Sequence, residues 1–182
     1  MNTTSLITEI LVAGFFCLLW VILFSIAIYD IKFDEIKYFL DLLKDWSTTV
    51  LLVGIAISYQ LGWVILYVSN ILSHKIIMST IRSNVFKEDK KNYNYIKNTV
   101  LANEKSSMLI KNLDKDRSLI RLTRTGFINF LFIGIALATL KLWFASLICI
   151  IVSLLNIFEL RVVYYSFYEK ILHSYNLLKK QK

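Results

Sequence analysis

The chain has 182 residues, of which 57% are hydrophobic and none is proline, and its mean hydropathy is +0.58. Its 21 Lys and Arg against 13 Asp and Glu leave a net charge of +8, and the charged residues gather between four uncharged stretches. A soluble domain usually holds about half apolar residues without such segregation. The composition therefore excludes a water-soluble globule, a disordered chain and a disulfide scaffold.

The uncharged stretches are Ile10–Tyr29, Val50–Leu72, Thr125–Leu140 and Leu142–Phe158. Because a helix rises about 1.5 Å per residue and the hydrocarbon core of a bilayer is about 30 Å thick, each span needs about 20 residues. We therefore expect an all-α, polytopic membrane protein with one membrane domain and transmembrane helices over residues 7–29, 48–72, 121–140 and 142–163. The first helix is expected to be a retained anchor, since residues 1–9 lack Lys and Arg and no A-x-A-like cleavage site follows.

Only Lys141 separates the third and fourth stretches, and neither Gly nor Pro marks a turn there. A single helix over Thr125–Phe158 would be about 50 Å long, which is far more than a bilayer needs. The sequence therefore predicts a tight turn at Thr139–Leu142, with the Lys141 ammonium group reaching out to the interface.

The distribution of Lys and Arg predicts the sidedness of the four spans. Residues 73–124 hold 12 Lys and Arg against 5 acidic residues and residues 159–182 hold 5 against 2, whereas residues 30–46 hold 3 against 5. Short loops rich in Lys and Arg lie on the cytoplasmic side of a membrane. Both termini are therefore expected in the cytoplasm, and the multi-pass chain is expected in the inner (plasma) membrane.

Residues 31–46 are predicted to form an amphipathic helix on the outer face, because apolar residues recur there at helical spacing opposite charged ones. The apolar side and the interfacial tryptophan are Ile36, Phe39, Leu40, Leu43 and Trp46. Such a helix lies in the headgroup region or caps the bundle. It serves either as a linker between two spans or as a surface that contacts a receptor.

Residues 73–120 are predicted to form a cytoplasmic helical hairpin, because apolar residues keep helical spacing on both sides of the KEDKKNYNY segment at Lys87–Tyr95. The tail over residues 164–182 is also expected to be helical. A short hairpin buries little surface by itself. Its apolar side therefore needs a cover, which is the tail helix, a second subunit or a separate protein.

Small residues recur at intervals of four on two predicted spans. Lipid supplies no hydrophobic drive for helix pairing, so membrane helices approach closely where their side chains are small. The helix-packing sites expected on this basis are Gly54, Ser58 and Gly62 on the second span and Gly134 and Ala138 on the third.

A polar seam follows one side of the fourth span and consists of Ser146, Cys149, Ser153 and Asn156. Unpaired polar groups are costly in hydrocarbon, so these side chains must face protein or water. Two interpretations remain open at this point: interhelical hydrogen bonding, and the lining of a water-filled pore in an oligomer.

Basic residues of the inner segment form a further candidate surface, made of Lys87, Lys90, Lys91, Arg117, Arg121 and Arg124. Their abundance is what positive-inside topology requires, and they also suit contact with anionic lipid headgroups or with a partner protein. The sequence contains no groove-reading element, so direct sequence-specific binding of nucleic acid is not expected.

The sequence contains no catalytic motif, no HExxH pair of histidines and no Gly-rich phosphate loop. Its two cysteines, Cys17 and Cys149, lie far apart within hydrophobic stretches and have no CxxC partner. No ionisable residue lies deep in a predicted span, which disfavours ion-coupled transport. The protein is therefore expected not to be an enzyme and to hold neither a metal nor a cofactor.

In outline, the four uncharged stretches and the KEDKKNYNY-centred inner segment resemble the small four-span membrane subunit of the bacterial Kiwa anti-phage defence system. The resemblance covers the whole chain, as a pattern. It implies a homo-oligomer in the bacterial inner membrane that senses envelope disturbance through the outer helix and holds a soluble, DNA-binding partner protein in the cytoplasm. We therefore expect a non-enzymatic scaffold or sensor. The alternatives are a pore-forming or membrane-depolarising effector and an accessory subunit of a larger membrane complex.

Overall fold

The computed structural model describes residues 3–73, 77–86, 93–103 and 107–180, and it confirms the predicted all-α class, since no strand occurs in these residues. The helices are α1 (Thr3–Tyr29), α2 (Phe33–Leu43), the 3-10 helix η1 (Lys44–Trp46), α3 (Ser47–Ser73), α4 (Ser79–Val85), α5 (Tyr93–Asn103), α6 (Ser107–Thr139) and α7 (Trp143–Lys180). Most of the segment predicted to be the turn of the hairpin, residues 87–92, lies outside the described residues.

Four of these helices, α1, α3, α6 and α7, contain segments long and apolar enough to cross a membrane, as predicted: Thr4–Tyr29, Ser47–Ser73, Lys111–Thr139 and Trp143–Leu177. Helix α6 has 33 residues and α7 has 38, so at about 1.5 Å per residue they are about 50 Å and about 57 Å long. Both helices therefore extend well beyond a hydrocarbon core of about 30 Å.

Two connections between helices use a residue in the left-handed region. Lys141 has a φ of 62°, and its N–H group and that of the next residue donate, at 3.0 Å each, to carbonyls in the last turn of α6. This arrangement is a Schellman cap, which here closes a helix without a glycine. Asp30, with a φ of 49°, takes the same conformation directly after α1. The chain therefore reverses at Thr139–Leu142, where the sequence predicts a turn.

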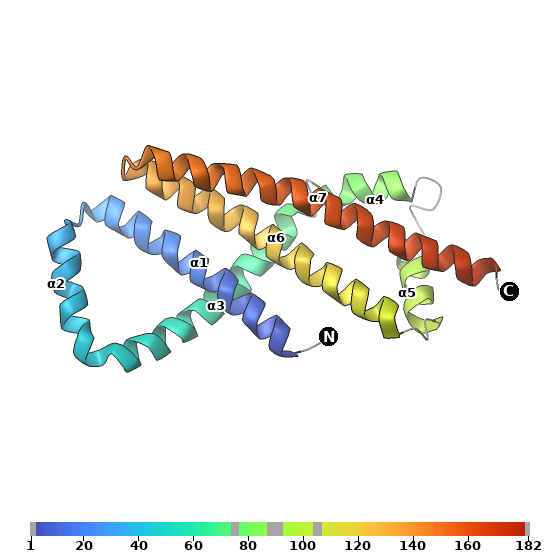
Figure 1. Cartoon of the computed structure of the whole chain (residues 1–182), viewed down its shortest axis with the longest axis horizontal. Coiled ribbons are helices and arrows are strands. Elements are labelled where there is room, and N and C mark those ends of the chain that lie inside the picture. The colour runs from blue at the N-terminus through green and yellow to red at the C-terminus, as the bar shows by residue number, and fades with distance from the viewer. Residues whose placement is uncertain (1–2, 74–76, 87–92, 104–106, 181–182) are drawn as a thin grey trace.

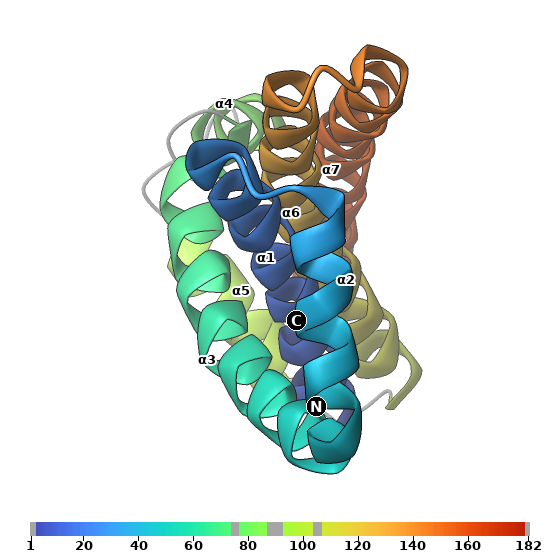
Figure 2. The same cartoon turned by 90° about the vertical axis from the view of Figure 1, so that its left-hand side faces the viewer.

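Figure 1 shows α6 and α7 running antiparallel, side by side, along most of the molecule. Helix α1 contacts both α3 and α6. Helix α3 crosses α1 and diverges from it toward α2, which together with η1 connects these two helices (Figures 1 and 2). Helix α2 and the α6–α7 turn lie toward the same side of the molecule, which we call the α2 end. The two termini, α4 and α5 lie toward the opposite side, which we call the charged end.

The outward faces of the spans are apolar. On α3 and α7, large side chains such as Leu51, Leu154 and Phe158 are between 60% and 69% exposed. In water an apolar surface of this extent would drive association, whereas lipid tails are as apolar as these side chains. Together with the four apolar helices, this surface is typical of a multi-pass membrane protein.

Candidate functional site

The main chains of α1 and α3 approach closely where these two helices cross. A Cβ atom added at Gly14 would overlap the carbonyl oxygen of Ser58, and one added at Gly62 would overlap the carbonyl oxygen of Ile10. The two main chains are therefore in direct contact, which only glycine permits at these positions. Of the small residues predicted to pack on the second span, Ser58 and Gly62 lie in this crossing.

Gly54 lies outside the crossing, which corrects its assignment as a packing residue: a Cβ atom added there would meet no atom within 4 Å. It borders an open apolar groove of about 600 Å³, which forms where α1 and α3 diverge and is lined by residues such as Phe15 and Leu51. The glycine that meets Ser58 is Gly14 instead. A search for small residues at intervals of four misses it, because Ile10 and Leu18 flank it at that spacing.

The second seam joins α6 to α7. A Cβ atom at Gly134 would lie 3.4 Å from the carbonyl oxygen of Ser146, and the Ser146 hydroxyl donates a hydrogen bond of 2.8 Å to the carbonyl of Gly134. Ala138, predicted for the same seam, is half-buried one turn further along α6. Gly134 therefore allows a direct side-chain-to-main-chain bond between the two helices.

The rest of the polar seam on α7 also turns toward α6. The Ser153 hydroxyl donates to the carbonyl of Phe127 at 2.9 Å, and the Asn156 side chain lies 2.9 Å from the Cβ position of Gly126. The half-buried Cys149 packs near Gly134. Because these polar groups are engaged within the chain, the arrangement favours interhelical packing over a pore lining.

A buried amide ties α6 to α1 in the middle of the bundle. Asn129 is 1% exposed. Its amide nitrogen donates to the carbonyl of Ala13 at 2.9 Å, and its amide oxygen accepts a bond of 3.2 Å from the Trp20 indole. Such bonds are worth about 0.6 kcal/mol each in a membrane protein, so Asn129 contributes orientation more than affinity.

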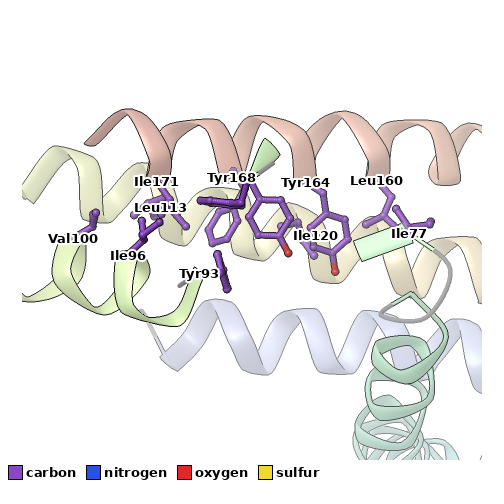
Figure 3. Close-up of a cluster of buried hydrophobic side chains, with 12 residues drawn as sticks. Ile77, Tyr93, Ile96, Val100, Leu113, Ile120, Leu160, Tyr164, Tyr168 and Ile171 are labelled. Atoms are coloured by element: carbon purple, nitrogen blue, oxygen red, sulfur yellow. The ribbon is translucent and has the colours of Figure 1, made fainter. Parts of the chain in front are cut away.

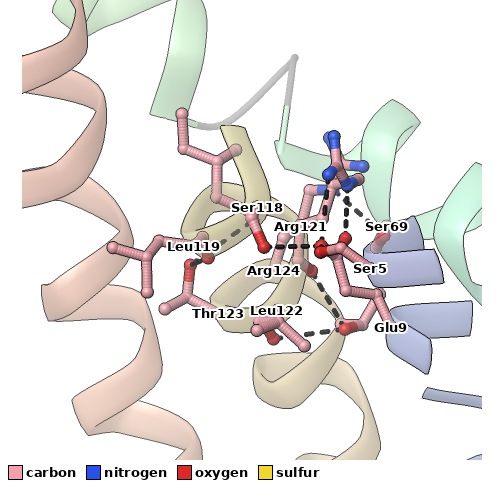
Figure 4. Close-up of polar contacts among 11 residues, drawn as sticks. Ser5, Glu9, Ser69, Ser118, Leu119, Arg121, Leu122, Thr123 and Arg124 are labelled. Atoms are coloured by element: carbon pink, nitrogen blue, oxygen red, sulfur yellow. Dashed lines mark hydrogen bonds and ion pairs between the residues drawn. The ribbon is translucent and has the colours of Figure 1, made fainter. Parts of the chain in front are cut away.

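Polar residues of α1 and α6 meet near the charged end, as Figure 4 shows. Glu9 is 6% exposed, and its carboxylate accepts a bond of 2.6 Å from the Arg121 Nε atom. The same carboxylate accepts bonds from the hydroxyls of Ser118 and Ser5. Glu9 therefore forms a charge-assisted link between helices, whereas the sequence suggests only a carboxylate near the start of a helix.

Arg124, one turn further along α6, has a different environment. It is 9% exposed, its Nε atom donates to the Ser69 hydroxyl at 3.2 Å, and its Nη1 atom donates to the Asn70 side-chain oxygen at 2.7 Å. Both partners belong to α3 and are neutral. Among the described residues, the ion pairs of α6 involve Asp114, Asp116, Arg117 and Arg121, so the charge of Arg124 lacks a carboxylate partner.

The predicted basic surface is therefore corrected in part. Arg121 and Arg124 face inward between helices, so they are not part of an outward surface for a partner protein. Arg117 is partly exposed and pairs with Asp114 at 3.0 Å. The remaining members, Lys87, Lys90 and Lys91, lie outside the described residues.

The charged end has a hydrophobic core of its own, drawn in Figure 3. We call the helices around it the end module: α4, α5, residues 107–120 of α6 and residues 160–175 of α7. The ring of Tyr168 is fully buried and lies 5.8 Å from that of Phe86 and 5.4 Å from that of Tyr93. The buried members of this core are Ile77, Phe86, Tyr93, Ile96, Val100, Leu113, Ile120, Leu160, Tyr164, Phe167, Tyr168 and Ile171.

This core shows which surface covers the apolar side of the predicted hairpin. Helices α4 and α5 both contact α7, and Lys170 of α7 forms a 2.7 Å ion pair with Asp116 of α6. Of the three covers considered from the sequence, the structure provides the tail helix. The apolar residues of the hairpin in the described part of the chain therefore do not by themselves require a further protein.

Two arginines lie beside aromatic rings of the end module. The guanidinium carbon of Arg82 is 5.6 Å from the ring centre of Tyr93, and that of Arg117 is 6.0 Å from the ring centre of Phe167. Such cation–π contacts are worth about 0.5–1 kcal/mol at exposed sites. Burial raises the pKa of the Tyr93 hydroxyl, and the two guanidinium groups oppose this shift.

The predicted amphipathic helix corresponds to α2 and η1. Ile36 and Leu43 are half-buried, and Trp46 is 64% exposed. The side chains of Phe39 and Leu40 lie outside the described set. The connection therefore presents both apolar and charged groups at the α2 end, where an interfacial tryptophan is typical.

In the described ranges, no group of three or more His, Cys, Asp or Glu residues is placed to hold a metal ion. Comparisons with protein-family models, with curated proteins and with solved structures find no match to this chain.

Proposed function

We propose that this protein is a non-enzymatic membrane scaffold, which holds a soluble partner protein on the end module. The observation that supports this proposal is the end module itself. About 20 of the 38 residues of α7 suffice to cross the hydrocarbon core, so its last 18 or so residues project about 27 Å beyond it. A membrane anchor alone needs no separate core at that distance.

The surface of the end module supports a polar partner. Its buried residues are engaged in the internal core, whereas Lys111, Lys115 and Arg161 are exposed to solvent or headgroups. Exposed cations increase the association rate with an acidic partner and help to select it. The partner surface proposed here is therefore acidic and largely polar.

The sidedness and the setting belong to the same proposal. The Lys and Arg counts favour a cytoplasmic end module and a cytoplasmic location of both termini. The resemblance in outline to the Kiwa membrane subunit favours a homo-oligomer in a bacterial inner membrane, in which α2 contacts the outer interface and responds to envelope disturbance during phage attachment.

Site-specific photo-cross-linking of the full chain in its native membrane tests this function. A photoreactive amino acid at exposed Asn112, next to Lys111 and Lys115, should give one discrete cross-linked protein. Reversal of both charges, with Lys111→Glu and Lys115→Glu, should remove it. The matched control is Lys32→Glu with Lys37→Glu at the α2 end, which should leave the product intact.

The outcome that contradicts the scaffold proposal is equally specific. If the probe at Asn112 gives only lipid adducts and self-adducts at native expression, the end module holds no soluble partner. A photoreactive group at Tyr38, which is 70% exposed on α2, provides the positional control. A product that appears equally at both positions would indicate non-specific capture.

A further inference from the structure

A pocket of about 460 Å³ opens where the end module meets the spans. Helices α1, α3, α5, α6 and α7 all contribute to its walls. The polar side chains that line it are Asn70, Lys97, Arg117, Arg121 and Arg124. The other lining residues are aromatic or aliphatic, so the pocket combines a cationic wall with an apolar one.

The pocket holds more positive charge than the chain neutralises. Its lining includes four cationic side chains and no acidic one. Glu9 pairs with Arg121 and Asp114 pairs with Arg117. In the part of the chain that the structure describes, no ion pair to Lys97 or Arg124 is present. Arg124 is also nine-tenths buried, so a cation inside the protein faces this pocket without a counter-charge.

The position of the pocket along the bundle indicates which kind of anion is available to bind there. Arg124 lies 15 residues before the end of α6, which places it about 22 Å from the α6–α7 turn along the helix. A hydrocarbon core of about 30 Å ends a few ångströms beyond that point. Trp63 and Tyr67, which also line the pocket, are 49% and 69% exposed, and such residues collect at the membrane interface.

We infer that this pocket binds the headgroup of an anionic phospholipid. The phosphate lies against Lys97 and Arg124, and the acyl chains follow the exposed apolar face of α3 beside Trp63 and Tyr67. Basic pockets between transmembrane helices take anionic headgroups in this way, and a buried arginine near hydrocarbon is costly without an anion. Because Lys97 belongs to α5 and Arg124 to α6, the lipid would connect the end module to the spans.

Thermal unfolding of the purified, delipidated full chain in a neutral detergent tests this site. Added phosphatidylglycerol should raise the melting temperature, whereas phosphatidylcholine at the same mole fraction and free inorganic phosphate should not. Lys97→Gln and Arg124→Gln should each weaken the phosphatidylglycerol response about fivefold, as expected for one cation facing an anionic lipid. Arg124→Lys should retain most of it.

The control is Lys111→Gln with Lys115→Gln, which removes two charges from the exposed surface of α6 outside the pocket. If this control loses as much of the phosphatidylglycerol response, the response depends only on the overall charge of the protein, and the proposed site is overturned. Lys97 is half-buried on the short helix α5, so its variant tests the pocket even where Arg124→Gln fails to fold. A melting temperature raised by inorganic phosphate alone would overturn the lipid assignment, and unchanged phosphatidylglycerol affinity in Lys97→Gln would overturn the proposal.

Discussion

Gly14→Ala should destabilise the protein, whereas the same substitution at Gly54 should not. At Gly14 the added Cβ atom would overlap the main chain of α3 at Ser58 and come within 2.7 Å of the Gly62 nitrogen. Main-chain atoms cannot rotate away as a flexible side chain can, so α1 and α3 would have to separate. At Gly54 the added atom meets nothing within 4 Å.

The expected free energies of unfolding of the two variants differ only by the cost of overpacking at Gly14. Each gains about 0.5–1 kcal/mol from replacing a glycine within a helix by alanine. Overpacking a close contact costs about 1–3 kcal/mol, and a rigid obstacle places Gly14→Ala at the upper part of that range. We therefore expect Gly14→Ala to lower the free energy of unfolding by about 2 kcal/mol, and Gly54→Ala to leave it unchanged or raise it by less than about 1 kcal/mol.

Reversible unfolding in mixed micelles, driven by increasing sodium dodecyl sulfate and followed by circular dichroism, measures this difference directly. Gly62→Ala should behave like Gly14→Ala, because its added Cβ atom would overlap the carbonyl of Ile10. Equal unfolding free energies for the Gly14 and Gly54 variants would refute the close crossing of α1 and α3.

Three further changes probe other contacts. In the same titration, Glu9→Ala should lower the free energy of unfolding by about 3 kcal/mol, the low end of the range for a buried ion pair, because Arg121, whose side chain is 18% exposed, loses its carboxylate. Tyr168→Phe should raise it by about 1 kcal/mol, because the buried Tyr168 hydroxyl has no hydrogen-bond partner among the residues that the structure describes. Ser153→Ala should leave ion flux through proteoliposomes unchanged, because the Ser153 hydroxyl bonds to α6; an altered flux would favour the pore interpretation.

The membrane architecture follows from local properties of the sequence. Whether a stretch can span a bilayer depends on its own length and apolarity, so four uncharged stretches predict four spans. The turn at Lys141 follows by the same reasoning, since an uninterrupted helix would be too long for the bilayer. In the structure, a lysine in the left-handed region forms this turn. The sequence does not predict that conformation, because no glycine is present there.

The contacts between helices could not be predicted in this way. Gly14 and Ser58 meet because α1 crosses α3 at one height, and Glu9 reaches Arg121 across 112 positions of sequence. Periodicity shows which residues share a side of one helix, but it contains no information about which helix lies opposite. The sequence by itself therefore determined the class, the spans and the turn. Only the tertiary structure decided that the tail covers the hairpin, that Arg121 and Arg124 turn inward, and that Gly14 replaces Gly54 in the crossing, because each of these depends on the relative placement of distant helices.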